Sequence, residues 1–184
     1  QILAPKRAAD IIASFKPDLA AYPLPGDWLT KEHLAVLISM TESAKVVSRG
    51  KTAVVIGGGV GRSEDTQEVI LEYLSQTSIP VVIDADAIHA IGKNPEIVKG
   101  KPFLITPHAF EFFVLTGKEV YQLSDEEKAK IVQDEAQRLQ TTILLKGQTD
   151  IISNGSEVAL NKTGSPFMTK GGTGDTLAGI AGAL

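Results

Sequence analysis

Residues 80–86 read Pro-Val-Val-Ile-Asp-Ala-Asp, a short apolar run that ends at two acids. A continuous run of β-branched residues is typical of a strand covered on both faces, so we predict a strand over residues 80–84. Similar runs predict strands at residues 19–22, 52–57, 103–106 and 142–146. Segments with apolar residues at helical spacing predict helices at residues 29–44, 66–76 and 124–139. This alternation predicts an α/β fold with a mostly parallel central sheet.

The chain after residue 146 has a different pattern. Residues 150–153 and 157–160 flank Asn154-Gly155, which predicts a β-hairpin with an Asn-Gly turn. An apolar helical pattern then runs from Asp175 to Leu184, where it stops without a cap or a polar tail. Residues 1–4 already resemble the middle of an element. We therefore expect a single domain over residues 1–184 that is incomplete at both ends.

The composition narrows the class of protein. The 184 residues are 43% apolar and 22% charged, which fits one globular domain and argues against disorder. The absence of cysteine excludes disulfides, thiolate metal sites and a cysteine nucleophile. A net charge of -4 argues against a nucleic-acid partner, and the apolar runs are too short to cross a membrane. Because no signal segment opens the chain, we expect a cytoplasmic protein.

A glycine-rich loop runs directly into the last helical pattern. Its sequence is Lys170-Gly-Gly-Thr-Gly-Asp-Thr176. Amide groups at the start of a helix, together with the helix dipole, form a site for an anion such as a phosphoryl group. Asp175, in the first turn, is then placed to accept a proton from an attacking hydroxyl. An acid in the first turn also stabilises a helix by itself, so the spacing alone leaves both interpretations of Asp175 open.

Polar residues also follow three of the predicted strands. Asp84 and Asp86 follow the strand at 80–84, and such acids either face a ligand crevice or cap the next short helix. His108 follows the strand at 103–106. Lys146 ends the strand at 142–146, where a lysine suits a phosphate better than a hydrophobic core.

Three glycines, residues 57–59, follow the strand at 52–57. The dinucleotide-binding pattern requires a further glycine where this chain has Arg62, so that pattern is absent. The run is therefore either a tight turn or a bare backbone surface against which a flat ligand lies.

Together these segments resemble the ATP/ADP-dependent NAD(P)H-hydrate dehydratase family, the carbohydrate-kinase-domain proteins of the ribokinase-like superfamily. Each stretch is common alone, but all of them in this order, across about residues 52–180, form a specific pattern. The matching stretches are Ile56-Gly-Gly-Gly59, Val82-Ile-Asp-Ala-Asp-Ala87, Leu104-Ile-Thr-Pro-His108 with Glu111-Phe112, Leu144-Leu-Lys-Gly147 and Gly171-Gly-Thr-Gly-Asp175.

The resemblance implies a ribokinase-like three-layer α/β/α sandwich and a lyase reaction. In that reaction ADP or ATP, with Mg²⁺, phosphorylates the hydroxyl of hydrated NADH or NADPH, and phosphate then leaves with a ring proton to restore the nicotinamide. The family also implies a homo-oligomer, a tetramer. Family members begin with a further strand before the equivalent of Ile2 and continue with helices after the equivalent of Leu184.

The same resemblance assigns roles to individual residues. Asp175 matches the family's acid beside the hydrate, and Gly59 and His108 match positions that contact the hydrate. The nucleotide-binding positions are matched by Lys146, Gly147, Gln148, Thr149, Asp150, Gly172, Thr173 and Gly174.

Two departures from the family pattern lie next to these positions. Ala109-Phe110 stands where the family has Pro-Gly, and Gly58 stands where it has proline.

Two other functions stay open on the sequence alone. One is a ribokinase-like kinase acting on a vitamin-precursor alcohol of the hydroxymethylpyrimidine or hydroxyethylthiazole type. The other is a fragment that binds nucleotide weakly without turnover.

Overall fold

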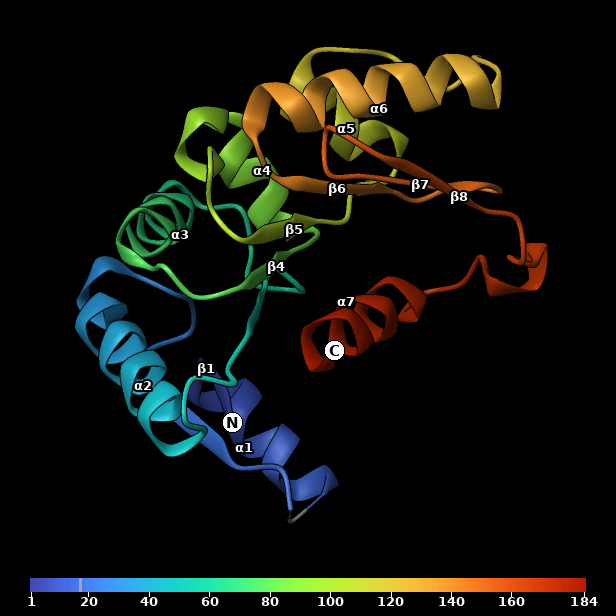
Figure 1. Ribbon diagram of the computed structural model, residues 1–184. Coiled ribbons are helices and arrows are strands. Elements are labelled where there is room, and N and C mark those ends of the chain that lie inside the picture. The colour runs from blue at the N-terminus through green and yellow to red at the C-terminus, as the bar shows by residue number, and fades with distance from the viewer. Residues whose placement is uncertain (17) are drawn as a thin grey trace.

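A computed structural model describes residues 1–16 and 18–184 (Figure 1). Its main sheet has the strand order β3-β4-β5-β6-β7-β8, in which β3 to β6 are parallel and β7 and β8 are antiparallel to their neighbours. This confirms the predicted α/β fold with a mostly parallel sheet. The strand bounds are β3 Val54–Ile56, β4 Val81–Ile83, β5 Phe103–Ile105, β6 Thr142–Leu145, β7 Asp150–Ser153 and β8 Val158–Asn161.

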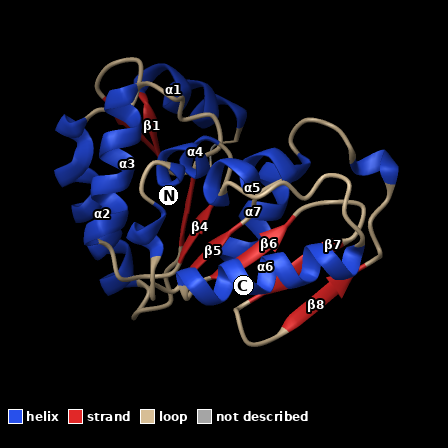
Figure 2. Ribbon diagram, turned by 90° about the horizontal axis from the view of Figure 1, so that it is seen from above, coloured by secondary structure: helices blue, strands red, loops and turns tan. Residues whose placement is uncertain are grey.

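Helices lie on both sides of this sheet and make a three-layer arrangement (Figures 1 and 2). Four helices cover one side: α3 (Glu64–Gln76), α4 (Asp86–Gly92), α5 (Ala109–Thr116) and α6 (Asp125–Leu139). The last helix, α7 (Thr173–Ala183), lies on the other side against β3 and β4. Short 3-10 turns occur at η1 (Lys31–His33), η2 (Pro95–Val98) and η3 (Pro166–Met168).

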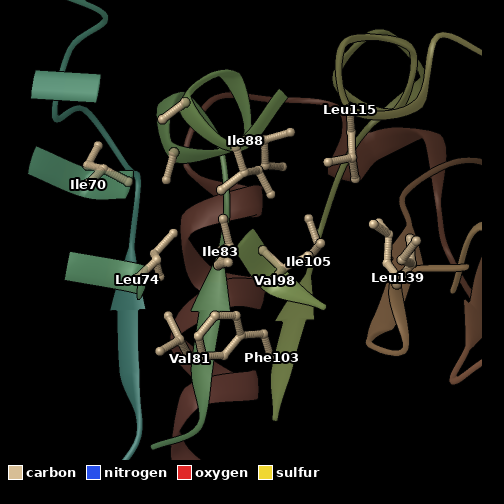
Figure 3. Packing of buried hydrophobic residues seen from close by; sticks show 14 of the residues in the cluster. Ile70, Leu74, Val81, Ile83, Ile88, Val98, Phe103, Ile105, Leu115 and Leu139 are labelled. Atoms are coloured by element: carbon tan, nitrogen blue, oxygen red, sulfur yellow. The ribbon is translucent and has the colours of Figure 1, made fainter. Parts of the chain in front are cut away.

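The core lies between the sheet and the layer of four helices. Alternate strand residues Val81, Ile83, Phe103 and Ile105 are at most 3% exposed and pack with side chains from the helices (Figure 3). Each such side chain contributes about 1.5–3 kcal/mol by leaving water. A shift of one residue would turn the whole set to the other face, so this packing fixes the strand register. The carboxyl ends of β3 to β6 are thereby held at one edge of the sheet.

The N-terminal segment differs from the prediction. The strand expected at residues 19–22 is β2 (Ala21–Leu24), and it pairs with β1 (Ile2–Pro5) in a separate two-stranded parallel sheet. α1 (Lys6–Phe15) connects the two strands. Pro5 and Pro23 lie within these strands, and proline cannot donate a ladder hydrogen bond, so neither strand suits the middle of a sheet. Neither β1 nor α1 was predicted from the sequence.

Two further boundaries also differ. The helix expected at residues 29–44 is α2 (Leu34–Val47), because Thr30 caps the short turn η1 before it. The predicted hairpin is present as β7 and β8, but Ser153 pairs with Val158, so the connection has four residues and is not a two-residue Asn-Gly turn. The predicted helices at 66–76 and 124–139 are confirmed as α3 and α6, and Ser124 caps α6 with a capping box.

Helix α6 carries a buried acid with two basic partners. Glu135 is 3% exposed, and its carboxylate lies 2.8 Å from Lys118 Nζ and 2.8 Å from Arg138 Nε. Burial by itself would raise the pKa of Glu135, but the hydrogen bonds from these two cations outweigh it and lower the pKa below its usual value.

Within the described residues, no helix is long and apolar enough to span a lipid bilayer.

Candidate active site

The segments that follow β3, β4, β5 and β6 lie side by side at one edge of the sheet. Main-chain hydrogen bonds continue the pairing past the strand ends: Asp84 N donates to Ile56 O (3.0 Å) and Thr106 N donates to Ile83 O (3.0 Å). Lys146 N donates to Pro107 O (2.7 Å). Most of the polar residues singled out in the sequence are therefore gathered at this edge, although Asp84 and Lys146 are 62 positions apart along the chain.

Lys146 and Asp84 form an ion pair at this edge. Lys146 Nζ lies 2.7 Å from Asp84 Oδ1, and the Thr106 hydroxyl donates to the same oxygen over 2.8 Å. Glu111 Oε2 lies 3.6 Å from the amine on another side. Asp84 and Glu111 are only 3% and 4% exposed. Because a buried charge is costly unless it is paired, one lysine balances two acids here and is held at the centre of the site.

The two acids after β4 have different partners, and neither caps α4. The N-cap of α4 is Ala85, and among the described residues no side chain forms a capping hydrogen bond at this helix start. Asp86 Oδ1 pairs with Arg62 Nε at 2.6 Å, while Asp86 Oδ2 accepts a hydrogen bond from Gly61 N at 3.0 Å. Asp86 thus holds the loop that follows the glycine run. The interpretation that Asp84 or Asp86 caps the next helix is therefore wrong.

The turn after β3 requires glycine at residue 57. Its φ of 129° lies in a region that other residues rarely adopt, and a side chain would collide with the Asp84 carbonyl group. This close approach allows Asp86 N to donate to Gly57 O over 3.2 Å. The tight turn that the sequence suggested is therefore present, and Gly58 and Gly59 beyond it are exposed.

The start of α7 lies close to the Lys146–Asp84 ion pair and to the glycine turn after β3. The helix itself lies on the side of the sheet opposite to α3, α4, α5 and α6. A Cβ placed on Gly174 would lie 3.7 Å from Lys146 Nζ and 3.8 Å from Asp84 Oδ2. A Cβ placed on Gly58 would lie 2.9 Å from Asp175 Oδ1. The helix start therefore lies next to the ion pair, and the absence of a side chain at Gly58 lets the Asp175 carboxylate lie against the glycine turn. The amides of the first turn, one cation and one exposed carboxylate are thus brought together.

His108 has a structural role in addition to its place in the site. It is the N-cap of α5: its Nδ1 accepts a hydrogen bond from Glu111 N (3.2 Å), and the Glu111 carboxylate accepts one from His108 N (2.8 Å). The spacing His-x-x-Glu is that of a capping box, which is the sequence signal that could have revealed the role of Glu111. The side chain of His108 is 53% exposed at the same edge as Lys146, with which it forms a β-bridge.

The segment after β6 makes several internal contacts. Asp150 Oδ1 accepts a hydrogen bond from Gly147 N (3.0 Å), and the Thr149 hydroxyl donates to Asp125 Oδ2 (2.9 Å). Gln148 and Gly147 are exposed. Of the residues that the resemblance assigns to the nucleotide, the structure therefore places Lys146 and Gly174 next to each other, while Thr149 and Asp150 shape the loop beside them.

A hollow is also found away from this edge. An open cavity of about 1020 Å³ is found at the amino-terminal edge of the sheet, where its lining includes Lys51, Lys101, Gln140 and Leu184. Lys101 is bonded there to main-chain carbonyls, including Ser75 O at 2.8 Å. We place the candidate site at the carboxyl edge in spite of this cavity, because that edge holds the paired charges and the helix start.

A sequence model described as NAD(P)H-hydrate dehydratase matches residues 1–184. The chain belongs to the NAD(P)H-hydrate dehydratase family. The bifunctional NAD(P)H-hydrate repair enzyme Nnr of Pyrobaculum aerophilum is 40% identical over 185 residues, which cover all of this chain and 35% of that protein. The chain therefore spans only about a third of the length of this relative.

Solved structures show the same fold. A ribokinase-like superfamily protein from Enterococcus faecalis aligns with a TM-score of 0.74 at 24% identity, over 98% of this chain and 58% of that one. An ADP/ATP-dependent NAD(P)H-hydrate dehydratase from Bacillus subtilis, co-crystallised with ATP and Mg²⁺, aligns with a TM-score of 0.67 at 25% identity, over 97% of this chain and 58% of that one. The fold of this family member is thus ribokinase-like, as the sequence motifs implied.

Proposed function

We propose that the protein dehydrates hydrated NADH or NADPH with ADP or ATP as co-substrate. The observation that carries this proposal is the meeting of Asp175, the start of α7 and the Lys146–Asp84 pair at one edge of the sheet. Membership of the NAD(P)H-hydrate dehydratase family supports a dehydratase over a kinase that releases a stable phosphorylated alcohol.

Different residues of the site bind the phosphoryl group and transfer the proton. The start of α7, formed by Gly172, Thr173 and Gly174, holds the terminal phosphoryl group of the nucleotide together with Lys146, which balances its charge. The Thr173 amide donates to Lys170 O at 3.4 Å, so the amides of Gly172 and Gly174 are the donors proposed for the phosphoryl oxygens. Asp175 accepts the proton of the substrate hydroxyl as its oxygen attacks phosphorus and the bond to the nucleotide breaks. In the second step the C–O bond breaks, inorganic phosphate leaves, and a ring proton is lost to restore the double bond. The products are NADH or NADPH, inorganic phosphate, the shortened nucleotide and a proton.

Other residues position the two ligands. Gly59 and His108 border the hydrate, on either side of the Asp84 segment. Gly147, Gln148, Thr149 and Asp150 form the loop that receives the nucleotide next to Lys146. The internal bonds of Thr149 and Asp150 suggest that these two residues act by fixing the loop, and that Gly147 and Gln148 touch the ligand.

The site is compatible with Mg²⁺ only together with phosphates. No group of three or more acids and histidines suited to a metal ion occurs among residues 1–16 and 18–184. Mg²⁺ in nucleotide sites is commonly held by one or two carboxylates plus phosphate oxygens, and Asp84 Oδ2, near the start of α7, fits that role. When bound, the ion would neutralise charge that develops on the phosphoryl oxygens.

The family resemblance also supports a homo-oligomer, a tetramer, and the location proposed for it is the cytoplasm. Light scattering on the purified protein tests the tetramer, and fractionation of cells tests the location.

The activity is tested by adding the protein to hydrated NADH with Mg²⁺ and either ADP or ATP. Dehydration restores the absorbance of the reduced nicotinamide and releases inorganic phosphate in equal amount. The natural full-length protein is the correct sample, because the chain spans only a fraction of its relatives. A stable phosphorylated alcohol without recovered absorbance would replace the dehydratase by a kinase, and no turnover of any kind would refute both.

A further inference from the structure

Phe110 is an exposed aromatic residue at the entrance of the site. It lies in the first turn of α5, two residues after the N-cap His108, and it is 60% exposed. The first turn of a helix does not require a phenyl ring, and an exposed ring leaves apolar surface in water. The ring therefore calls for a reason other than the stability of α5.

Two imidazoles flank this ring. The centroid of the Phe110 ring lies 6.1 Å from that of His89 on α4 and 6.5 Å from that of His108, with interplanar angles of 46° and 32°. These separations are within the range of interacting aromatic pairs. Burial lowers the pKa of His89, and the nearby guanidinium of Arg62 lowers it further, so this imidazole is neutral at pH 7. The three rings form one aromatic surface, which we call the aromatic recess.

A fixed guanidinium lies beside the aromatic recess. The Nε atom of Arg62 is bonded to Asp86 Oδ1 at 2.6 Å, and the Arg62 side chain is 55% exposed. A guanidinium that is held in place and reaches solvent is suited to phosphate oxygens. An aromatic surface next to an oriented guanidinium has the two features that recognise a nucleotide moiety, because stacking holds the base and the cation holds its phosphate.

The aromatic recess is on the substrate side of the site. His89 belongs to α4, which follows β4, whereas the loop after Lys146 follows β6, and β5 lies between these two strands. Phe110 lies between His89, on the β4 side, and His108, which follows β5 and forms a β-bridge with Lys146. The recess therefore extends from α4 to the segment that follows β5, and the loop proposed for ADP or ATP follows the next strand, β6.

From this placement, and relying on the proposed function, we infer that Phe110 stacks on a ring of the hydrated dinucleotide and is a specificity-determining residue for that substrate. The ring is either the adenine of the dinucleotide or its hydrated nicotinamide. Both present a face to the phenyl group, and both are attached to the phosphates that Arg62 would reach.

The test compares Phe110→Ala, Phe110→Tyr and Phe113→Ala in the full-length protein. Stacking of a base on an aromatic side chain predicts that Phe110→Ala raises KM for hydrated NADH by about 5- to 150-fold, with little change in KM for the nucleotide. Phe110→Tyr keeps the stacking surface and should stay within about threefold of the parent. Phe113, on the same helix and 40% exposed, is the matched control, and Phe113→Ala should leave both KM values unchanged. Equal effects of Phe110→Ala and Phe113→Ala, or an effect confined to the nucleotide, would overturn the inference.

Hydrated reduced nicotinamide mononucleotide, which lacks the adenosine half, separates the two rings. A loss caused by Phe110→Ala with the dinucleotide but not with the mononucleotide identifies adenine, and equal losses identify the nicotinamide ring. Calorimetric titration with NADH, which needs no turnover, keeps the inference separate from the proposed function. Weaker binding by Phe110→Ala supports the aromatic recess even in a protein without dehydratase activity, whereas equal affinity, or no binding by the parent, overturns it.

Discussion

Replacement of Lys146 by methionine tests the centre of the site most directly. Methionine keeps most of the side-chain volume and removes the amine that lies 2.7 Å from Asp84 Oδ1 and 3.6 Å from Glu111 Oε2. Removing one partner of a buried ion pair typically costs about 3–5 kcal/mol, because the other charge is left buried. Asp84 keeps the Thr106 hydroxyl at 2.8 Å, and Lys146 itself is 20% exposed, so we expect the lower end, about 3 kcal/mol.

Urea unfolding followed by circular dichroism measures this loss as a lower midpoint with an unchanged slope. The control is Lys162→Met, since the Lys162–Asp125 pair spans 3.8 Å at the surface and its loss should cost less than about 1 kcal/mol. Adding Asp84→Asn to Lys146→Met should recover part of the stability, because the buried acid is then neutral. A Lys146→Met cost no larger than that of the control, or a double variant whose loss is the sum of the two single losses, would refute the description of this pair as a coupled buried unit.

The remaining predictions concern the base, the glycine turn and an acid far from the site. Asp175→Asn should lower turnover by about 10²- to 10⁴-fold while calorimetry still detects nucleotide binding, and persistent turnover would show that another group is the base. Gly58→Ala places a Cβ 2.9 Å from Asp175 Oδ1 and should lower kcat, by up to about 10²-fold for a displacement of about 1 Å. Gly179→Ala, whose Cβ would meet nothing within 4 Å, should retain full turnover. The lowered pKa of Glu135 means that its native carboxyl binds fewer protons than the unfolded one, so its stabilisation is complete above the ordinary pKa of 4.5 and is lost as pH falls below that value. Glu135→Gln should make midpoints of thermal unfolding less dependent on pH below 4.5, and parallel curves for the two proteins would contradict this.

Local patterns were sufficient for the strands of the main sheet and for several helix starts. The β-branched runs at β3, β4, β5 and β6 form strands whose ends lie within two residues of the prediction. The capping box at Ser124 begins α6 as expected. The strand predicted at residues 19–22 has an apolar pattern like those of the main-sheet strands, so the pattern could not show that it joins a separate sheet. Pro23 and the pairing of β2 with β1 decide which sheet this strand joins.

The ordered motifs of the chain were enough to identify the family and to mark Asp175, Lys146 and His108 as candidate site residues. These conclusions depend on residue types and short spacings, which are properties of neighbouring positions along the chain. The pairing of Lys146 with Asp84, the contact of Gly58 with Asp175 and the placement of Phe110 between two imidazoles depend instead on folding. They join residues from different strands and helices, and only the packing of the sheet between its helix layers sets the distances between their atoms. For the same reason, the interpretation of Asp84 and Asp86 as helix caps could be rejected only once the partners of each carboxylate were seen in three dimensions.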